Sequence, residues 1–281
     1  MTIVGLIPKI ETPQAATLTR TICQWLQERG HEPLVEAQAG VRGCPTAPGV
    51  DVAARADLLV VLGGDGTLLH AARLCAGREV PILGVNLGTL GFLTEVPRER
   101  IYPLLEKALA GELRSTRRLM LTAQVLSGDR TVLEDVALND VVFSRQAQSV
   151  IARMEVRIDG SVAANYDADG LIIATPTGST AYSLAAAGPI VYPTLEAILL
   201  TPICPHALTQ RPVVLPASAS ISLRLRNSTE MYLTIDGNPG RALELGEEIV
   251  VRAAPQRTII LRNPEVEPFG LWRDKLRWGA R

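Results

Sequence analysis

The stretch LLVVLGGDGTLLHAAR, residues 58–73, decides the fold of the first half of the chain. Its first part is an uninterrupted apolar run, which predicts a strand buried on both faces, and its last part has apolar residues at helical spacing. Between the two lies the turn GGDGT, residues 63–67. A strand that leads through glycines into a helix is typical of the ligand-binding edge of an open α/β sheet.

The residues around this stretch repeat the same alternation. Strands are predicted at residues 2–7, 57–62 and 80–86, and helices at residues 16–30, 67–77 and 98–111. Strands that are apolar on both faces and alternate with helices indicate a parallel sheet covered by helices. Residues 1–115 are therefore predicted to form an α/β domain with a doubly wound parallel sheet.

After residue 115 the pattern changes to strands with a period of two, separated by turn residues. These runs lie at residues 119–126, 137–144, 152–160, 171–176, 220–227, 231–237 and 257–263. They predict an all-β, sandwich-like domain over residues 116–264, with one helix at residues 179–187. In the tail, residues 265–281, one predicted helix face carries Leu271, Trp272, Leu276 and Trp278, so we expect it to pack back on the α/β domain.

Composition excludes several classes of function. The 281 residues have a formal net charge of -1, which argues against binding to the nucleic-acid backbone. The chain has neither a membrane-spanning apolar run nor a signal-peptide pattern, so we expect a cytoplasmic protein without membrane contact. The four dispersed cysteines indicate buried thiols. None of the three lysines, Lys9, Lys107 and Lys275, adjoins a glycine-rich turn in the sequence, which excludes a Walker A loop.

Asp65 is the one carboxylate in the first glycine turn. Glycines there allow a positive φ and let a phosphate approach backbone N–H groups without meeting a Cβ. Because a carboxylate repels phosphate, Asp65 indicates either bound Mg²⁺ or a proton acceptor for a hydroxyl that attacks the phosphate. The alternative is an aspartate that caps the next helix. His70, further along that helix, either points toward the phosphates or faces solvent.

Two further segments carry polar residues at strand ends. The stretch NLGTLGFLTE, residues 86–95, is expected to neighbour the first turn in the sheet. In it, Asn86 is a candidate to bind a ligand, and Phe92 is either a ring face for a base or a core residue. In the second half, Asn139 and Asp140 either end a strand or offer an amide to a base and a carboxylate to ribose hydroxyls.

The run DADGLIIATPTGSTAYSLAAAGPI, residues 167–190, leads from a strand into a predicted helix. Ser179 and Thr180 are good N-cap residues, so a well-capped helix is one interpretation. The other interpretation starts from four hydroxyl residues clustered around a glycine at the helix N-terminus. They form a neutral pocket, rich in hydrogen-bond donors, for a sugar or an amide.

Taken in order, these motifs resemble the NAD kinase family over most of the chain from Asp57 onward. The matching segments are GGDGT, NLGTLGFLTE, LND, DGLIIATPTGSTAY, AAGPI, TPICPHALTQRP and WRDKLRW. The resemblance implies a site in the cleft between the two domains, and a homodimer or homotetramer. It also implies transfer of the γ-phosphate of ATP, or of a phosphate from polyphosphate, to the 2′-hydroxyl of the adenosine ribose of NAD. The product is NADP, and the divalent cation, Mg²⁺, is carried by the nucleotide rather than by a cluster of protein ligands.

On this resemblance Asp65 is the catalytic base, Gly66 lies on the phosphates, and Asn139 and Asp140 bind the dinucleotide. Asp169 and residues 180–183 line the nicotinamide and ribose side. The residues expected to bind NAD or ATP are Gly63, Gly64, Gly66, Thr67, His70, Asn86, Phe92, Asn139, Asp140, Asp167, Asp169, Thr177, Thr180, Ala181, Tyr182, Ser183, Asp236 and Asn238.

This sequence departs from the family pattern at two positions. Asp167 stands where many bacterial members carry arginine, which bears on the preference between NAD and NADH. Asn238 stands where glutamine often follows the Asp-Gly pair, and its side chain is shorter by one methylene. Two other functions are alternatives to the NAD kinase: a lipid kinase of the diacylglycerol or sphingosine type, which also resembles GGDGT, and a non-catalytic dinucleotide sensor.

Overall fold

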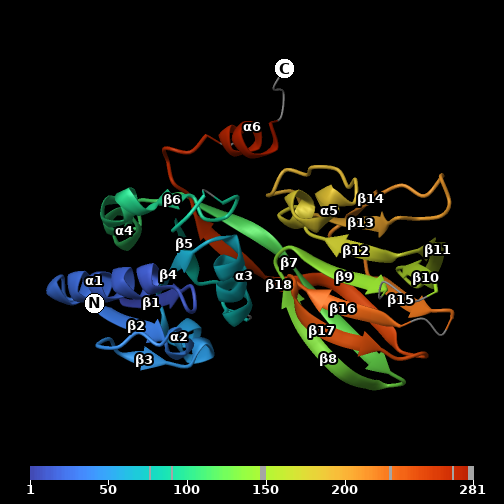
Figure 1. The fold of residues 1–281 in the computed structure, drawn as a ribbon, viewed down its shortest axis with the longest axis horizontal. Helices are drawn as coiled ribbons and strands as arrows, with labels where there is room; N and C mark the ends of the chain where they lie inside the picture. Colours follow the sequence, from blue (N-terminus) through green and yellow to red (C-terminus); the bar gives the residue numbers. More distant parts are fainter. Residues whose placement is uncertain (76, 90, 146–149, 228–229, 268, 278–281) are drawn as a thin grey trace. The chain divides into compact units, whose positions relative to one another are not determined.

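The computed structural model describes residues 1–75, 77–89, 91–145, 150–227, 230–267 and 269–277 (Figure 1). The chain divides into two compact units, which we call the first unit (Met1–Arg117 with Thr258–Arg281) and the second unit (Arg118–Arg257). Strands β7 (Ser115–Ser127) and β18 (Glu248–Leu261) each continue from one unit into the other.

The first unit is built on a parallel sheet. Its strand order is β5-β4-β1-β2-β3, and the end of β18 runs parallel to β5. Neighbouring strands in this order are all parallel. The strands are β1 (Ile3–Pro8), β2 (Glu32–Glu36), β3 (Thr46–Ala47), β4 (Leu58–Gly63), β5 (Pro81–Asn86) and β6 (Val96–Pro97). The predicted α/β architecture is confirmed.

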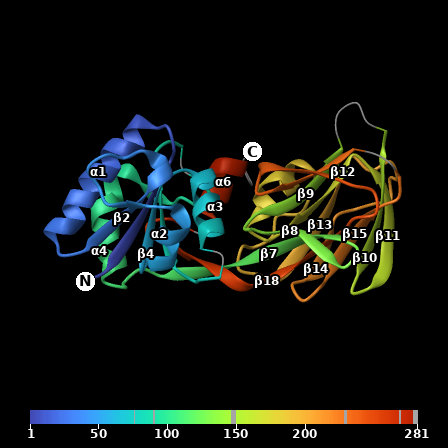
Figure 2. The ribbon, with the colours of Figure 1, turned by 90° about the horizontal axis from the view of Figure 1, so that it is seen from below.

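Helices cover both faces of this sheet. Figure 2 shows α1 and α4 on one face, and α2 and α3 on the other. The helices of the unit are α1 (Pro13–Glu28), α2 (Gly49–Arg55), α3 (Asp65–Leu74), α4 (Ile101–Leu109) and α6 (Gly270–Leu276), with 3-10 turns η1 (Ala37–Ala39) and η2 (Arg98–Arg100). Ile22 of α1 and Leu104 of α4 share one core with Val60 of β4. Since both faces are covered, β4 is buried along its whole length, as its apolar run predicts.

Some local predictions in the first unit need correction. The helix predicted from residue 67 begins at Asp65, and the helix predicted at residues 98–111 consists of η2 followed by α4. Strand β2 and helix α2 lie outside the predicted elements. Cysteine burial is also mixed, because Cys23 and Cys75 are buried whereas Cys204 is exposed.

The second unit consists of two antiparallel sheets. One has the order β14-β13-β12-β9-β16-β17; in the other, β11-β10-β15-β18 is extended by β7 and β8. The strands are β8 (Arg130–Ala137), β9 (Asp140–Arg145), β10 (Ala152–Ile158), β11 (Ser161–Ala168), β12 (Gly170–Ala174), β13 (Ala197–Ile203), β14 (Val213–Pro216), β15 (Ile221–Leu225), β16 (Met231–Ile235) and β17 (Asn238–Leu243). Phe143 and Ile173 of one sheet share a core with Leu121 and Val156 of the other. The predicted all-β, sandwich-like architecture is confirmed.

The helix predicted at residues 179–187 is wrong in length. The segment forms a 3-10 turn η3 (Gly178–Thr180) and a single helical turn α5 (Tyr182–Ala185), because Ala181 leaves the helical region with ψ at -130°. Ser179 does not cap a helix. Its hydroxyl donates to the Pro176 carbonyl at 2.7 Å and accepts the Val191 N–H at 3.0 Å. It therefore ties the turn to the chain twelve residues later.

In the C-terminal tail, helix α6 buries Leu271 and leaves Trp272 and Leu276 half-buried. Trp278, which the sequence pattern puts on the same face, lies outside the described residues. None of the helices in the described part of the chain combines the length and the apolar character needed to cross a bilayer.

Candidate functional site

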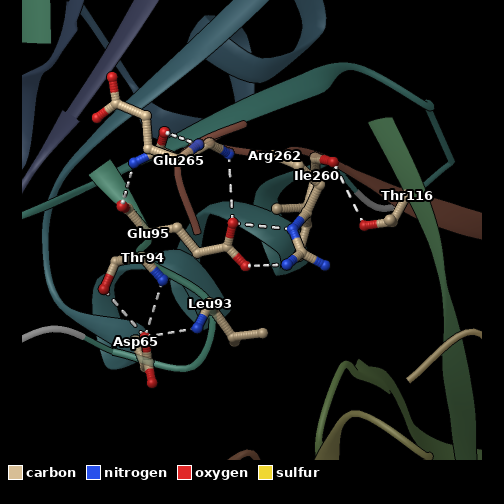
Figure 3. A network of polar contacts seen from close by, with 9 residues as sticks. Asp65, Leu93, Thr94, Glu95, Thr116, Ile260, Arg262 and Glu265 are labelled. Atoms are coloured by element: carbon tan, nitrogen blue, oxygen red, sulfur yellow. Dashed lines mark hydrogen bonds and ion pairs between the residues drawn. The ribbon is translucent and has the colours of Figure 1, made fainter. Parts of the chain in front are cut away.

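Asp65 joins the two glycine turns of the first unit. It is the first residue of α3, and the N-cap of that helix is Gly64, so Asp65 is not the cap. Its Oδ2 accepts the N–H of Phe92 at 2.7 Å, and its Oδ1 accepts the N–H groups of Leu93 and Thr94 at 3.0 and 3.1 Å. The Thr94 hydroxyl adds a fourth bond to Oδ1 at 3.0 Å (Figure 3). The carboxylate is thus held in one orientation by the second turn.

Glycines are needed in these turns for space rather than for a positive φ. A Cβ on Gly91 would lie 1.9 Å from Asp65 Oδ1, so a side chain there would displace the carboxylate. Gly64 and Gly66 are open, with no atom within 4 Å of an added Cβ, and neither they nor Gly63 has a positive φ. The expectation of positive φ in the first turn is wrong, whereas open space for a close approach to the backbone is present.

An ion pair between the buried Glu95 and the partly exposed Arg262 holds the second turn in place. Glu95 is 3% exposed, and Arg262 contacts its two carboxylate oxygens at 2.8 Å each. The Asn263 side chain donates to the Glu95 carbonyl at 3.1 Å. Figure 3 shows this pair next to the Asp65–Thr94 contact, with Arg262 at the end of β18. The turn that orients Asp65 is therefore fixed to the C-terminal segment of the first unit.

Asn86 and Phe92 are placed by the second turn. The Asn86 amide donates to the Thr89 carbonyl at 2.8 Å and to the Thr94 hydroxyl at 3.0 Å, and its Oδ1 accepts the Gly88 N–H at 2.7 Å. Its side chain is thus occupied in shaping the turn. Phe92 is half-buried, and the ammonium group of Lys275 lies 5.3 Å from its ring centroid.

The His70 side chain is half-buried and contacts a buried carboxylate. Its Nε2 lies 2.8 Å from Oε1 of Glu36, a residue that is 1% exposed. The other oxygen of Glu36 has no hydrogen-bond partner among the described residues. The contact with Glu36, the last residue of β2, therefore orients the imidazole ring of His70.

Two hollows flank the first glycine turn. The first, of about 380 Å³, is lined by Pro8, Lys9, Ile10, Gly64, Gly66, Thr67 and His70. The second, of about 360 Å³, is lined by Lys9, Thr12, Gln14, Gly63, Gly64, Asn86, Leu87, Gly88 and Thr89. Both hollows lie at the carboxyl edge of the parallel sheet, where open α/β sheets bind their ligands.

In the second unit, Asp236 organises the LND turn. With φ at 50°, it accepts the N–H groups of Leu138, Asn139 and Asp140 at 2.8, 2.7 and 3.0 Å. Burial raises the pKa of Asp236, although these three bonds oppose the shift. Asp236 therefore holds the backbone of the LND turn in place. Asn139, on the same turn, is half-buried.

Asp140 is the most perturbed carboxyl group in this region. It is 5% exposed, and burial raises its pKa from 3.8 to about 7, with a further contribution from the charge of Asp236. A hydrogen bond from the N–H of Tyr182 opposes this shift. The bond also ties the start of α5 to the LND turn.

The hydroxyl cluster separates into occupied and free groups. The Ser183 hydroxyl is fully buried and bonds that of Thr201 at 3.0 Å, and Thr180 donates to the Thr177 carbonyl at 3.3 Å. The Thr177 hydroxyl is buried and has no partner among the described residues. Tyr182 is exposed and Ala181 half-exposed. Of the hydroxyl groups in this cluster, that of Thr177 is the one that is buried and lacks a partner among the described residues.

The remaining predicted positions are Asp167 on β11, Asp169 between β11 and β12, and Asn238 at the start of β17. Asp169 accepts a bond from Arg145 Nε at 2.7 Å, whereas Asp167 is exposed, 3.7 Å from Arg153 Nε across the β10–β11 ladder. The Asn238 amide donates to the Ile235 carbonyl at 3.1 Å. No group of three or more His, Cys, Asp or Glu side chains is gathered as a metal site in the described ranges.

Comparison with known proteins gives the family. The model of the ATP-NAD kinase N-terminal domain matches residues 50–113, and that of the ATP-NAD kinase C-terminal domain matches residues 138–262. The NAD kinases of Geobacter metallireducens and Geobacter sulfurreducens are 47% and 45% identical to this chain, with 99% of each chain covered. This chain belongs to the NAD kinase family. The resemblance seen in the sequence is confirmed.

Solved structures of related kinases share the fold. A crystal structure of yeast NADH kinase complexed with NADH has 29% sequence identity and a TM-score of 0.89, covering 100% of this chain and 88% of that one. An NAD kinase from Archaeoglobus fulgidus, in complex with ATP, has a TM-score of 0.77 at 23% identity, covering 98% of each chain, and supports the fold alone. The two-domain NAD kinase fold is therefore present here.

Several residues around the NAD kinase motifs were not found from the sequence. Lys9 is far from GGDGT in the chain, yet it lines both hollows beside that turn. The exclusion of a lysine near the turn therefore holds for the sequence but not for the structure. Glu36 contacts His70, which lies 34 residues away in the sequence. Arg262 likewise contacts Glu95, which lies 167 residues away. The one available signal was that parallel strands bring their carboxyl ends to one edge of the sheet.

Proposed function

We propose that this protein is an NAD kinase that transfers the γ-phosphate of ATP to the 2′-hydroxyl of the adenosine ribose of NAD, giving NADP. In the reaction a bond forms between the ribose oxygen O2′ and the γ-phosphorus, and the bond from the γ-phosphorus to the β,γ-bridging oxygen breaks, so ADP leaves. The proton of the hydroxyl passes to Asp65 and then to solvent. Family membership and the ordered motifs support this function.

The fixed carboxylate of Asp65 is the observation that carries the proposal. Four hydrogen bonds orient it, three to Oδ1 and one to Oδ2. Oδ2 therefore keeps acceptor capacity for a substrate hydroxyl, as a general base requires. A purely binding site for phosphates gains nothing from an anion at this position, which argues against the dinucleotide sensor. Gly64 and Gly66, open on the side of an added Cβ, leave room for phosphates next to the carboxylate.

We assign dinucleotide binding to the LND turn and the segment that follows β12. Asp140 and Asn139 offer a carboxyl group and an amide, and the unpartnered hydroxyl of Thr177 offers a donor. Buried polar groups that lack a protein partner are costly unless a ligand or water satisfies them. The nicotinamide and ribose of the substrate contain both donors and acceptors that suit this set.

A divalent cation, Mg²⁺ in this proposal, would arrive with the nucleotide. The described residues form no cluster of carboxylate, imidazole or thiol ligands, so the phosphates of the donor are its natural ligands. A cation held there would supply positive charge against the negative charge of the phosphates. This also reduces the repulsion between the donor and Asp65.

An assay of NADP(H) formation tests the function. The full chain is incubated with Mg²⁺ and each pairing of ATP or polyphosphate with NAD or NADH, and with ATP plus diacylglycerol or sphingosine. We expect product with a dinucleotide acceptor and no lipid phosphorylation. Formation of phosphorylated lipid without NADP(H) would instead support the lipid kinase. Light scattering of the same sample tests whether the protein is the homodimer or homotetramer that the family resemblance implies.

The role of Asp65 is tested with Asp65→Asn and a matched control. The amide cannot accept a proton, so NADP formation is expected to fall by about 10²–10⁴-fold while NAD still binds. Thr94→Val is the control, because it removes one of the four bonds to Asp65 but leaves the carboxylate. Its turnover should fall by about 10-fold at most. Equal losses in the two variants would assign Asp65 to shaping the turn rather than to proton transfer.

A further inference from the structure

Lys9 lies at the base of the first glycine turn, although 54 residues separate it from Gly63. It directly follows β1, which pairs with β4 in parallel, and its N–H donates to the Leu62 carbonyl at 2.9 Å. A Cβ added to Gly63 would lie 3.2 Å from the Cβ of Lys9. The backbone of the sheet therefore places the start of this side chain against the turn.

The ammonium group of Lys9 has no carboxylate partner among the described residues. Lys9 lines both hollows, and neither hollow has an aspartate or glutamate in its lining. The other titratable lining residue is His70, which contacts Glu36. Lys9 is thus an exposed cation that stands between two hollows whose described walls carry no negative charge.

We propose that Lys9 binds the phosphates of the phosphoryl donor at the GGDGT turn. The proposal rests on the proposed function and names a donor-binding residue on β1, outside the glycine motifs. A flexible ammonium group suits a chain of phosphates, since it contacts different oxygens without a fixed geometry. Gly64 lines both hollows and has no side chain to obstruct such a chain of phosphates. ATP and inorganic polyphosphate share this phosphate chemistry, so one contact serves either donor.

The test compares Lys9→Gln and Lys9→Arg with the wild-type chain in the NADP-forming assay and in direct binding. For Lys9→Gln we expect the KM for ATP to rise about 10-fold, with the KM for NAD within about twofold and kcat within about threefold. Lys9→Arg should restore most of the affinity, since it keeps the charge. Calorimetry with tripolyphosphate, which has no base or ribose, should show a Kd about 10-fold weaker for Lys9→Gln.

Lys107→Gln is the matched control, because it removes the same charge from α4, where Lys107 lines a different hollow. Unchanged ATP KM and tripolyphosphate Kd in Lys9→Gln would overturn the proposal, and so would equal effects in Lys107→Gln. The outcome is separable from the function. NADP formation that is insensitive to Lys9 would refute only this inference, whereas Lys9-dependent tripolyphosphate binding without any NADP formation would refute only the proposed reaction.

Discussion

Asp65 and Thr94 are joined by two hydrogen bonds, because Oδ1 of the carboxylate accepts both the N–H of Thr94 at 3.1 Å and its hydroxyl at 3.0 Å. Asp65 starts α3, and Thr94 ends the turn after β5. A rigid acceptor at this position needs no reorganisation when a substrate hydroxyl arrives, which is how preorganised polar groups assist a reaction. The second glycine motif therefore supports the first, and both contribute to one carboxylate.

Gly91 is predicted to be the most sensitive glycine of the second turn. In Gly91→Ala the new Cβ meets Asp65 Oδ1 at 1.9 Å and the Thr94 hydroxyl at 2.5 Å, so the carboxylate must move. We expect NADP formation to fall by more than about 10-fold, and the free energy of unfolding to fall by about 1–3 kcal/mol. Gly88→Ala is the stability control, since no atom lies within 4 Å of its added Cβ. Urea unfolding of both variants checks the difference, and equal stabilities would contradict this geometry.

Glu95 is predicted to hold the second turn through Arg262. Glu95→Gln removes the counter-charge of Arg262, whose side chain is 21% exposed, so we expect a loss somewhat below the about 3–5 kcal/mol that breaking a fully buried pair costs. Arg55→Gln is the control, because the Arg55–Glu32 pair at 3.2 Å is exposed, with side-chain exposures of 51% and 40%. Loss of an exposed pair should cost about 1 kcal/mol or less. Denaturant midpoints measure both, and a Glu95→Gln loss as small as the control would show that the buried pair contributes no more than the exposed one.

The architecture of both halves could be predicted because burial leaves a local pattern. Strand β4 is apolar at every position since helices cover both of its faces. In the second unit, strands such as β15 and β16 alternate between buried and more exposed positions, whereas β12 is buried at every position. Each glycine or hydroxyl motif can likewise be recognised in a short segment of sequence, and the order of these motifs along the chain indicated the family. The prediction of a helix at residues 179–187 was wrong in length, because Ala181 leaves the helical region and Ser179 bonds Val191 instead of capping. Neither feature can be recognised from helix signals in the sequence.

The supporting contacts of the site could not be predicted, since each joins residues far apart in the chain. Lys9 reaches GGDGT only through the pairing of β1 with β4. Asp236 accepts three N–H groups of the LND turn, which lies 96 to 98 residues away in the sequence. The local sequence IDGNPG, residues 235–240, does not predict these three bonds. Thr177 and Ser183 look alike in the sequence, but a partner hydroxyl on Thr201 occupies Ser183 and none occupies Thr177 among the described residues.

Asp140 is predicted to make the stability of the protein depend on pH. Its pKa is raised from 3.8 to about 7, so the native state keeps this proton over a range in which the unfolded chain has lost it. The unfolded chain binds fewer protons there, and the contribution of Asp140 to the free energy of unfolding therefore falls as the pH rises from about 4 to about 7. A shift of this size corresponds to a loss on the order of 4 kcal/mol.

Asp140→Asn removes this titration while keeping a side chain of similar size. Because other carboxyl groups also titrate, the quantity to measure is the stability of the wild type minus that of Asp140→Asn, from urea unfolding at intervals between pH 4 and pH 8. This difference should decrease with pH up to about 7 and then level off. The same measurement on Asp129→Asn, which replaces a carboxyl group on the exposed turn between β7 and β8, serves as the control. A flat difference for Asp140→Asn would mean that its carboxyl group ionises equally easily in the folded and unfolded chain, and that burial at the LND turn does not hold its proton.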